Sequence, residues 1–137
     1  MPAEGGGLFF DTNVLLYLIS GDLPKARQLD VHLLQGGMIS VQVLNELTNV
    51  ARRKYGLHTS QIRPFLMTLR EALVVLPLSL EVHETGLGII ERYGLSTYDA
   101  MVVAAALHGN CGTVLNEDMQ DGMSIYGKLR ILNPFRA

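Results

Sequence analysis

The chain has 137 residues, of which 48% are hydrophobic and 18% are charged, and its formal net charge is −2. This composition excludes an intrinsically disordered chain and indicates a globular domain with a substantial core. A single cysteine excludes an internal disulfide and a structural zinc site of several cysteines, so we expect a reducing, cytoplasmic setting. No apolar run approaches the roughly 20 residues that span a bilayer, and the N-terminus lacks the pattern of a signal peptide. We therefore expect no membrane partner.

The slightly negative charge argues weakly against a nucleic-acid-binding protein, because such proteins usually carry a basic surface. Two bound divalent cations, which add four positive charges, would change the formal net charge from −2 to +2. Charge alone therefore does not exclude a nucleic-acid substrate.

Short apolar runs alternate with segments of helical periodicity along the chain. The first run, at 7–10, predicts a strand, and the helix that follows it is interrupted near 20–24, where Asp22 is a candidate N-cap. The remaining predicted elements are a helix at 25–35, a strand at 38–41, helices at 43–56 and 58–72, a strand at 73–77, helices at 79–94 and 96–110, and strands at 112–116 and 129–132.

This order of elements predicts an α/β fold, a three-layer α/β/α sandwich around a mostly parallel five-stranded sheet. The strands are continuously apolar, as expected where helices cover both faces of a sheet. There is no internal repeat and no low-complexity linker, so we expect a single domain over residues 1–137. The glycine run near the start predicts that residues 1–6 form a flexible lead-in.

Four acidic residues lie just after predicted strands or at the start of a helix. Asp11 ends the first strand, Glu46 lies about one turn into the helix after the second, Asp118 follows the fourth, and Asp99 begins the helix at 96–110. Parallel sheets place their sites at the carboxyl ends of strands, so we expect these acids to converge. Converging carboxylates repel unless a cation is shared, and oxygen ligands favour Mg²⁺ or Mn²⁺. Such ions activate water for attack on phosphate esters.

Each acid also has a simpler interpretation. Asp11 could serve only as a helix N-cap, and the STYD sequence that contains Asp99 fits a capping box. Glu46 could lie on a solvated helix face, and Asp118 competes with two other acids in the polar turn NEDMQDG. The shared location of the four acids is therefore the basis of the inference.

Four segments, taken in order, resemble the motifs of the PIN domain (PilT N-terminus) family, and the last resembles its VapC-type toxin ribonuclease branch. They are FFDTNVLLYLI, SVQVLNELTNV, LSTYDAMVVAAAL and TVLNEDMQDGMSIYGKLRILNPF, which together run from about Leu8 to Phe135. The resemblance implies strand order 3-2-1-4-5, with the first and fourth strands adjacent. It also implies an endoribonuclease dependent on Mg²⁺ or Mn²⁺ that leaves 5′-phosphate and 3′-hydroxyl ends, the toxin of a type II toxin–antitoxin pair.

The resemblance maps the family's three near-invariant acids to Asp11, Glu46 and Asp99, and a fourth acidic position to Asp118. We expect these four residues to be catalytic and to bind the metal. Auxiliary roles are expected for Asn13, Asn116 and Asp121. Asn116 departs mildly from the family, which often has Ser or Thr there, because an amide can still hold a phosphate or a metal-bound water.

Candidate RNA-binding residues lie outside the acids. Arg52, Arg53 and Lys54 form the densest basic run, and Tyr98 could stack on a base. The basic run could equally be a solvated helix end, and Tyr98 could be packing. The sequences NVLLYLI and PFLMTLREAL contain more apolar residues than a small core needs. We therefore expect a homodimer and an antitoxin protein as partners, beside the RNA substrate.

Two rival functions can be weighed against this interpretation. An aspartyl phosphatase resembling the haloacid dehalogenases needs a second Asp two residues after the first, where this chain has Asn13. A catalytically silent PIN-like module that binds RNA or protein is the alternative from another class. The presence of all four acids favours an active enzyme.

Overall fold

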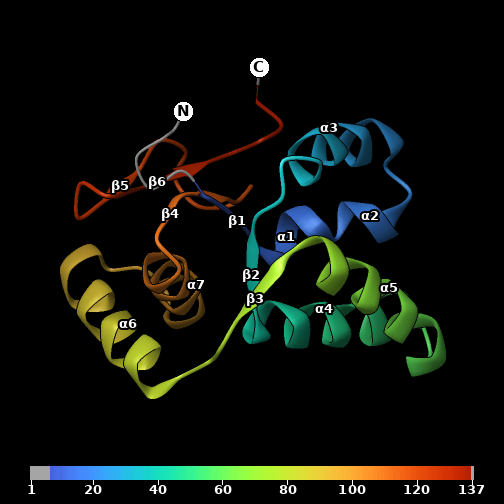
Figure 1. Cartoon of the computed structure of the whole chain (residues 1–137), viewed down its shortest axis with the longest axis horizontal. Helices are drawn as coiled ribbons and strands as arrows, with labels where there is room; N and C mark the ends of the chain where they lie inside the picture. The colour runs from blue at the N-terminus through green and yellow to red at the C-terminus, as the bar shows by residue number, and fades with distance from the viewer. Residues whose placement is uncertain (1–6, 137) are drawn as a thin grey trace.

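The computed structural model describes residues 7–136, so the expected flexible lead-in at 1–6 lies outside the described residues (Figure 1). Six strands form one sheet in the order β3-β2-β1-β4-β6-β5. Their bounds are β1 Gly7–Phe10, β2 Met38–Ser40, β3 Val74–Leu76, β4 Cys111–Leu115, β5 Ser124–Ile125 and β6 Leu129–Leu132. The predicted order is confirmed for the five strands that the sequence indicated, with β1 and β4 adjacent.

The number of strands was predicted wrongly, because β5 is an additional edge strand. It pairs antiparallel with β6, whereas the other four pairings are parallel. Tyr126 and Gly127 between them have positive φ angles of 53° and 66°, which produce the tight turn of a two-stranded hairpin. A strand of two residues is too short to have a recognisable alternation of apolar and polar residues.

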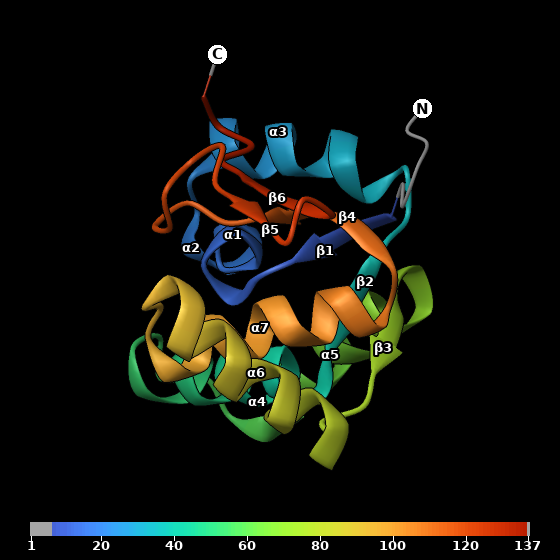
Figure 2. The same ribbon diagram turned by 90° about the vertical axis from the view of Figure 1, so that its left-hand side faces the viewer.

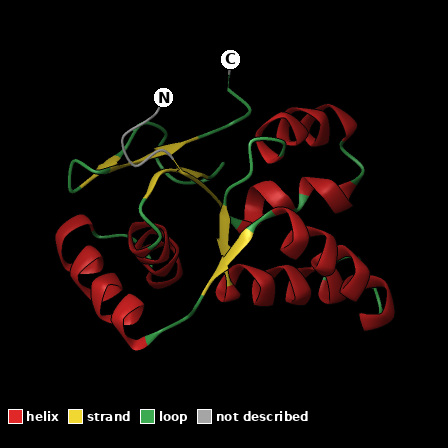
Figure 3. Cartoon of the chain, in the orientation of Figure 1, coloured by secondary structure: helices red, strands yellow, loops and turns green. Residues whose placement is uncertain are grey.

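Helices cover both faces of the sheet, which confirms the three-layer architecture. Helices α6 and α7 lie on one side of the sheet and α1 to α5 on the opposite side (Figures 1 and 3), and Figure 2 shows α6 and α7 below β1 and β4, in front of α4. Their bounds are α1 Thr12–Leu15, α2 Tyr17–Ser20, α3 Leu23–Leu33, α4 Val41–Arg53, α5 Thr59–Ala72, α6 Leu80–Tyr93 and α7 Thr97–His108. None of these helices is long and apolar enough to cross a membrane.

The predicted first helix is divided into α1 and α2, which meet at Leu16. Helix α2 ends at Gly21, whose φ of 88° reverses the chain toward α3. Asp22 caps α3, as predicted, by accepting a hydrogen bond from the backbone N–H of Lys25.

Helix α7 is the central buried helix, and its residues from Ala100 to Ala106 are all buried. It packs between the sheet and α6. Gly86 of α6 makes this close approach possible, since a Cβ there would lie 2.5 Å from the sulfur of Met101. The absence of a side chain at Gly86 thus favours the close packing of α6 against α7.

Candidate active site

Asp11 lies where β1 ends and α1 begins. Its backbone N–H donates to the carbonyl of Leu115 on β4 at 3.1 Å, and its side chain is only 5% exposed. One carboxylate oxygen accepts from the N–H of Thr12 at 2.7 Å, and the other accepts from the side-chain amide of Asn116 at 2.5 Å. Asp11 therefore is the N-cap of a short helix, and it is also held rigidly at the carboxyl end of the central strands.

The electrostatic surroundings of Asp11 are unusual for a carboxylate. Burial raises its pKa to about 7, although the hydrogen bonds from Thr12 and Asn116 act in the opposite direction. The carboxylates of Glu46 and Asp99 raise the pKa further, so both lie close enough to repel a charge on Asp11. Three of the four predicted acids are thus brought together at one end of the sheet.

Two neutral side chains orient Glu46. The hydroxyl of Thr12 donates to one carboxylate oxygen at 2.6 Å, and the side-chain amide of Gln42 donates to the other at 3.1 Å. Gln42 was not among the predicted site residues. The signal that could have identified it is its spacing, because Gln42 and Glu46 are four residues apart on one helix and share a face.

Asp99 lies in the first turn of α7, where Ser96 caps the helix by accepting from the N–H of Asp99 at 3.4 Å. The amide of Gln42 also donates to the carbonyl of Tyr98 at 3.3 Å, which ties α4 to the start of α7. The Tyr98 side chain is 69% exposed, so it is not core packing. It lines an open cavity of about 430 Å³ with Gln42, Asn45, Glu46, Asn49 and Leu78.

Two asparagines connect Asp118 to this group. The amide of Asn13 donates to the carboxylate of Asp118 at 3.1 Å and to the carbonyl oxygen of the Asn116 side chain at 3.2 Å. That oxygen also accepts from the backbone N–H groups of Asp118 and Met119, each at 2.7 Å. Asn116, which also donates to Asp11, therefore links the first acid to the fourth.

The neighbouring acid Glu117 points away from the site. It pairs with Lys25 at 2.6 Å and accepts a hydrogen bond of 2.5 Å from the hydroxyl of Tyr17. Burial favours its neutral form, but the bonds from Lys25 and Tyr17 outweigh burial and hold the pKa of Glu117 below its ordinary value. Of these two adjacent acids, Asp118 is the one that faces Asn13.

Asp121, predicted as an auxiliary residue, is engaged by the C-terminal segment instead. Its carboxylate accepts from the backbone N–H of Asn133 at 2.8 Å and lies 3.7 Å from the guanidinium of Arg136. These contacts give Asp121 a role in holding the end of the chain, and it contacts none of the other predicted acids through a hydrogen bond.

The donor set suits a hard divalent cation in its chemistry but is not arranged as a complete ligand shell. Across residues 7–136, no three carboxylate, imidazole or thiol groups are placed to bind one ion. The oxygens of Asp11 and Glu46 are occupied by neighbouring donors. A buried carboxylate repelled by two others is nevertheless the environment that a cation relieves. The residues therefore fit Mg²⁺ or Mn²⁺ if their carboxylates exchange these hydrogen bonds for the ion.

The predicted basic residues lie further along α4 and are exposed. Arg52 and Arg53 line an open cavity of about 690 Å³ at the end of the helix, together with Asn49, Gly56, Leu57, His58 and Thr59. Asn49 also lines the cavity beside Glu46 and Tyr98, so the two cavities are adjacent along α4. One face of this helix thus runs from the acids to the arginines.

Residues 8–122 match the PIN domain family, and the chain belongs to that family. No curated protein sequence matches the chain. Solved structures with a similar fold include the following three. A chain of a toxin–antitoxin complex from Klebsiella pneumoniae is 22% identical, with 96% of this chain and 100% of that chain covered and a TM-score of 0.71. VapC20 of Mycobacterium tuberculosis, a toxin that cleaves the sarcin-ricin loop, is 21% identical, with 82% and 92% covered and a TM-score of 0.66.

The third similar structure is that of FitAB bound to a DNA fragment. It is 18% identical, with 95% of this chain and 96% of that chain covered and a TM-score of 0.69. At these identities the likeness defines the fold, and what each of those proteins binds or cleaves is a property of that protein.

Proposed function

We propose that the chain is a metal-dependent endoribonuclease that hydrolyses RNA phosphodiester bonds and acts as the toxin of a type II toxin–antitoxin pair. The main support is the buried carboxylate of Asp11, whose pKa is raised to about 7 by burial and then by Glu46 and Asp99. Such a group of acids is costly to maintain in a fold unless it serves a cation. Membership of the PIN domain family is the second support.

In this proposal Asp11, Glu46, Asp99 and Asp118 hold Mg²⁺ or Mn²⁺, which supplies an activated water and stabilises the charge that develops on phosphate. Asn116 fixes the orientation of the Asp11 carboxylate at a rigid strand end. Thr12 and Gln42 fix the carboxylate of Glu46 in the same way. The protein's own groups thus orient the acids.

RNA would lie along the exposed face of α4 in this proposal. Tyr98 beside the acids is exposed enough to stack on a base, and Arg52 and Arg53 would hold phosphates further along the strand. The adjoining cavities that share Asn49 support this path. Lys54 is exposed at the end of the same helix and would extend the basic surface.

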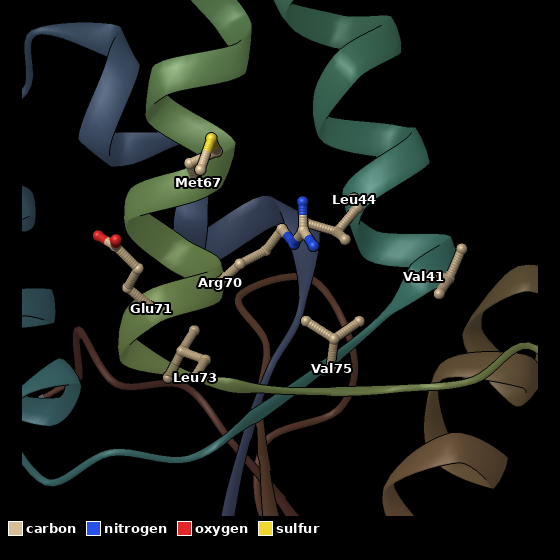
Figure 4. Close-up of a pocket in the computed structure, with 7 residues that line it drawn as sticks. All are labelled: Val41, Leu44, Met67, Arg70, Glu71, Leu73 and Val75. Atoms are coloured by element: carbon tan, nitrogen blue, oxygen red, sulfur yellow. The ribbon is translucent and has the colours of Figure 1, made fainter.

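The proposed partners are an antitoxin and a second copy of the chain. The likeness to a chain from a toxin–antitoxin complex supports the antitoxin. For the second copy we propose the groove between α4 and α5, of about 470 Å³, which Figure 4 shows in close-up. It is lined by Val41, Leu44, Met67, Arg70, Glu71, Leu73 and Val75. Its adjacent opposite charges, Arg70 and Glu71, would pair with their counterparts across a twofold axis.

The proposal is tested by incubating purified protein with total RNA and Mg²⁺ or Mn²⁺, beside an EDTA control and the Asp11→Asn variant. Discrete fragments that disappear in both controls are expected. Cleavage that persists in both would contradict the proposed site. The alternative, a catalytically silent binding module, predicts no cleavage but retention of RNA by both proteins.

A further inference from the structure

Glu117 is held by Tyr17 of α2 and Lys25 of α3, and Phe135 of the C-terminal segment packs against both of them. We call these four residues the Glu117 cluster. The ammonium of Lys25 donates to Glu117 at 2.6 Å and to the Tyr17 hydroxyl at 3.1 Å. The hydroxyl of Tyr17 in turn donates to the other oxygen of Glu117. Both oxygens of Glu117 are therefore fixed by charge-assisted or hydroxyl donors.

Aromatic contacts close the same cluster. The Lys25 nitrogen lies 4.5 Å from the centre of the Tyr17 ring and 5.2 Å from that of Phe135, and the two rings meet edge to face at 5.1 Å. Cation–π contacts and an edge-to-face pair favour this arrangement beyond the ion pair alone. Figures 1 and 2 show the C-terminal end of the chain next to α3, as these contacts require.

The segment from Asn116 to Asp121 is fixed at both ends. At the first end, the backbone N–H of Asn116 donates to the backbone carbonyl of Leu132 at 3.0 Å. At the far end, the carboxylate of Asp121 accepts from the N–H of Asn133 at 2.8 Å. Between these anchors, Glu117 is the residue whose side chain reaches across to the α2–α3 region.

Asp118 follows Glu117 directly and has few contacts of its own. Its side chain is exposed, and the hydrogen bond from Asn13 at 3.1 Å is the one that its carboxylate receives among the described residues. The backbone N–H of Glu117 donates to Asn13 as well, at 3.2 Å. Movement of Glu117 would therefore shift both Asp118 and the asparagine that orients it.

We propose that Lys25 and Tyr17 are positioning residues, which set the place of the Asp118 carboxylate relative to Asp11 by holding Glu117. The proposal rests on the proposed function only in assigning a metal-binding role to Asp118. A purely structural cluster would instead change thermal stability without changing what Asp118 does.

Lys25→Met and Tyr17→Phe are each made in the wild-type protein and in the Asp118→Ala variant. The Mn²⁺ affinity of each protein is measured by titration calorimetry. Lys25→Met is expected to weaken Mn²⁺ binding about tenfold, as is typical when a group that orients a ligand is removed. The same change in the Asp118→Ala protein is expected to have no further effect. Lys25→Arg should retain most of the affinity, and Lys128→Met, at an exposed lysine of the β5–β6 turn, should retain all of it.

If the wild type binds Mn²⁺, equal weakening of that binding with and without Asp118, or no weakening in either background, would overturn the proposal. A second readout does not depend on any metal. Hydrogen exchange at the amides of Asp118 and Met119, which donate to Asn116, should be faster in Lys25→Met and in Tyr17→Phe than in Lys128→Met. Unchanged exchange would overturn the positioning role. A wild-type protein that binds no Mn²⁺ but shows this change in exchange would count against the proposed function alone.

Discussion

The side-chain amide of Asn116 donates a 2.5 Å hydrogen bond to the carboxylate of Asp11, although the two residues are 105 positions apart in the sequence. The bond joins the ends of β1 and β4, which pair in parallel with Phe10 opposite Leu115. Crevices at such strand ends are where open α/β sheets bind ligands. Asn116 thus orients the first acid and, through Asn13, the fourth.

The stability of the metal-free protein should depend on the ionisation of Asp11. Burial raises its pKa from 3.8 to about 7. Between those values the folded state keeps a proton that the unfolded state has lost, so the free energy of unfolding should fall as pH rises and level off above about 7. The total decrease is on the order of 4 kcal/mol.

Urea denaturation from pH 4 to pH 8 in EDTA measures this dependence. The Asp11→Asn variant is the control, since it has no carboxyl group to titrate at that position. The difference in unfolding free energy between the two proteins should change with pH over this window. A constant difference would contradict the raised pKa.

The Thr12→Val variant should bind the metal less tightly, because it removes the hydroxyl that donates to Glu46 while keeping the side-chain shape. Loss of such an orienting group typically weakens metal binding by about tenfold or more. Thr48→Val is a matched control on α4, because its hydroxyl bonds only the carbonyl of Leu44 in its own helix. Equal Mn²⁺ affinities for the two variants in calorimetry would argue against the role of Thr12.

Replacing Arg52 and Arg53 with alanine should weaken RNA binding while leaving the chemistry intact. We expect a higher KM with an unchanged kcat, and a shallower dependence of binding on salt, by about one unit of log–log slope. Arg63→Ala, at an exposed arginine of α5, controls for lost positive charge. An equal effect of Arg63→Ala would show that general charge, rather than the face of α4, determines RNA binding.

The Met67→Glu variant should dissociate the proposed homodimer, because Met67 is 49% exposed in the groove between α4 and α5. Burying a carboxylate in the interface would cost free energy, which pairing with Arg70 on the same helix would offset only in part. Light scattering after size exclusion should give a dimer for the wild type and for Leu34→Glu, which changes an exposed leucine outside the groove. A monomeric wild type at high concentration would refute the dimer.

The sequence was sufficient to predict that Asp11 and Asp118 follow strands, because the ends of apolar runs are local features. The order of the strands in the sheet came from the resemblance to the PIN domain family. The sequence did not identify Thr12 and Gln42 as the residues that orient Glu46, since those contacts depend on how α1 approaches α4. The polar turn alone left Asp118 and its neighbour Glu117 as competing candidates, and the resemblance to the PIN domain family selected Asp118. The residue that distinguishes them is Lys25, which lies 92 positions from Glu117 in the sequence and pairs with it only in the folded chain.

The small differences between the predicted and the observed fold also arise from tertiary contacts. The two-residue strand β5 is defined by its pairing with β6 rather than by any pattern of its own. Helices α1 and α2 share one apolar run, and their separation at Leu16 has no clear signal in that run. Tertiary contacts therefore decide the details that local periodicity does not.

Anomalous diffraction from crystals grown with Mn²⁺ tests the central claim most directly. We predict a manganese peak at the carboxyl ends of β1 and β4, ligated by Asp11 and by at least one of Glu46 and Asp99, which is absent from crystals of Asp11→Asn. A well-ordered crystal in saturating Mn²⁺ with no peak there, or with a peak that persists in Asp11→Asn, would contradict the account.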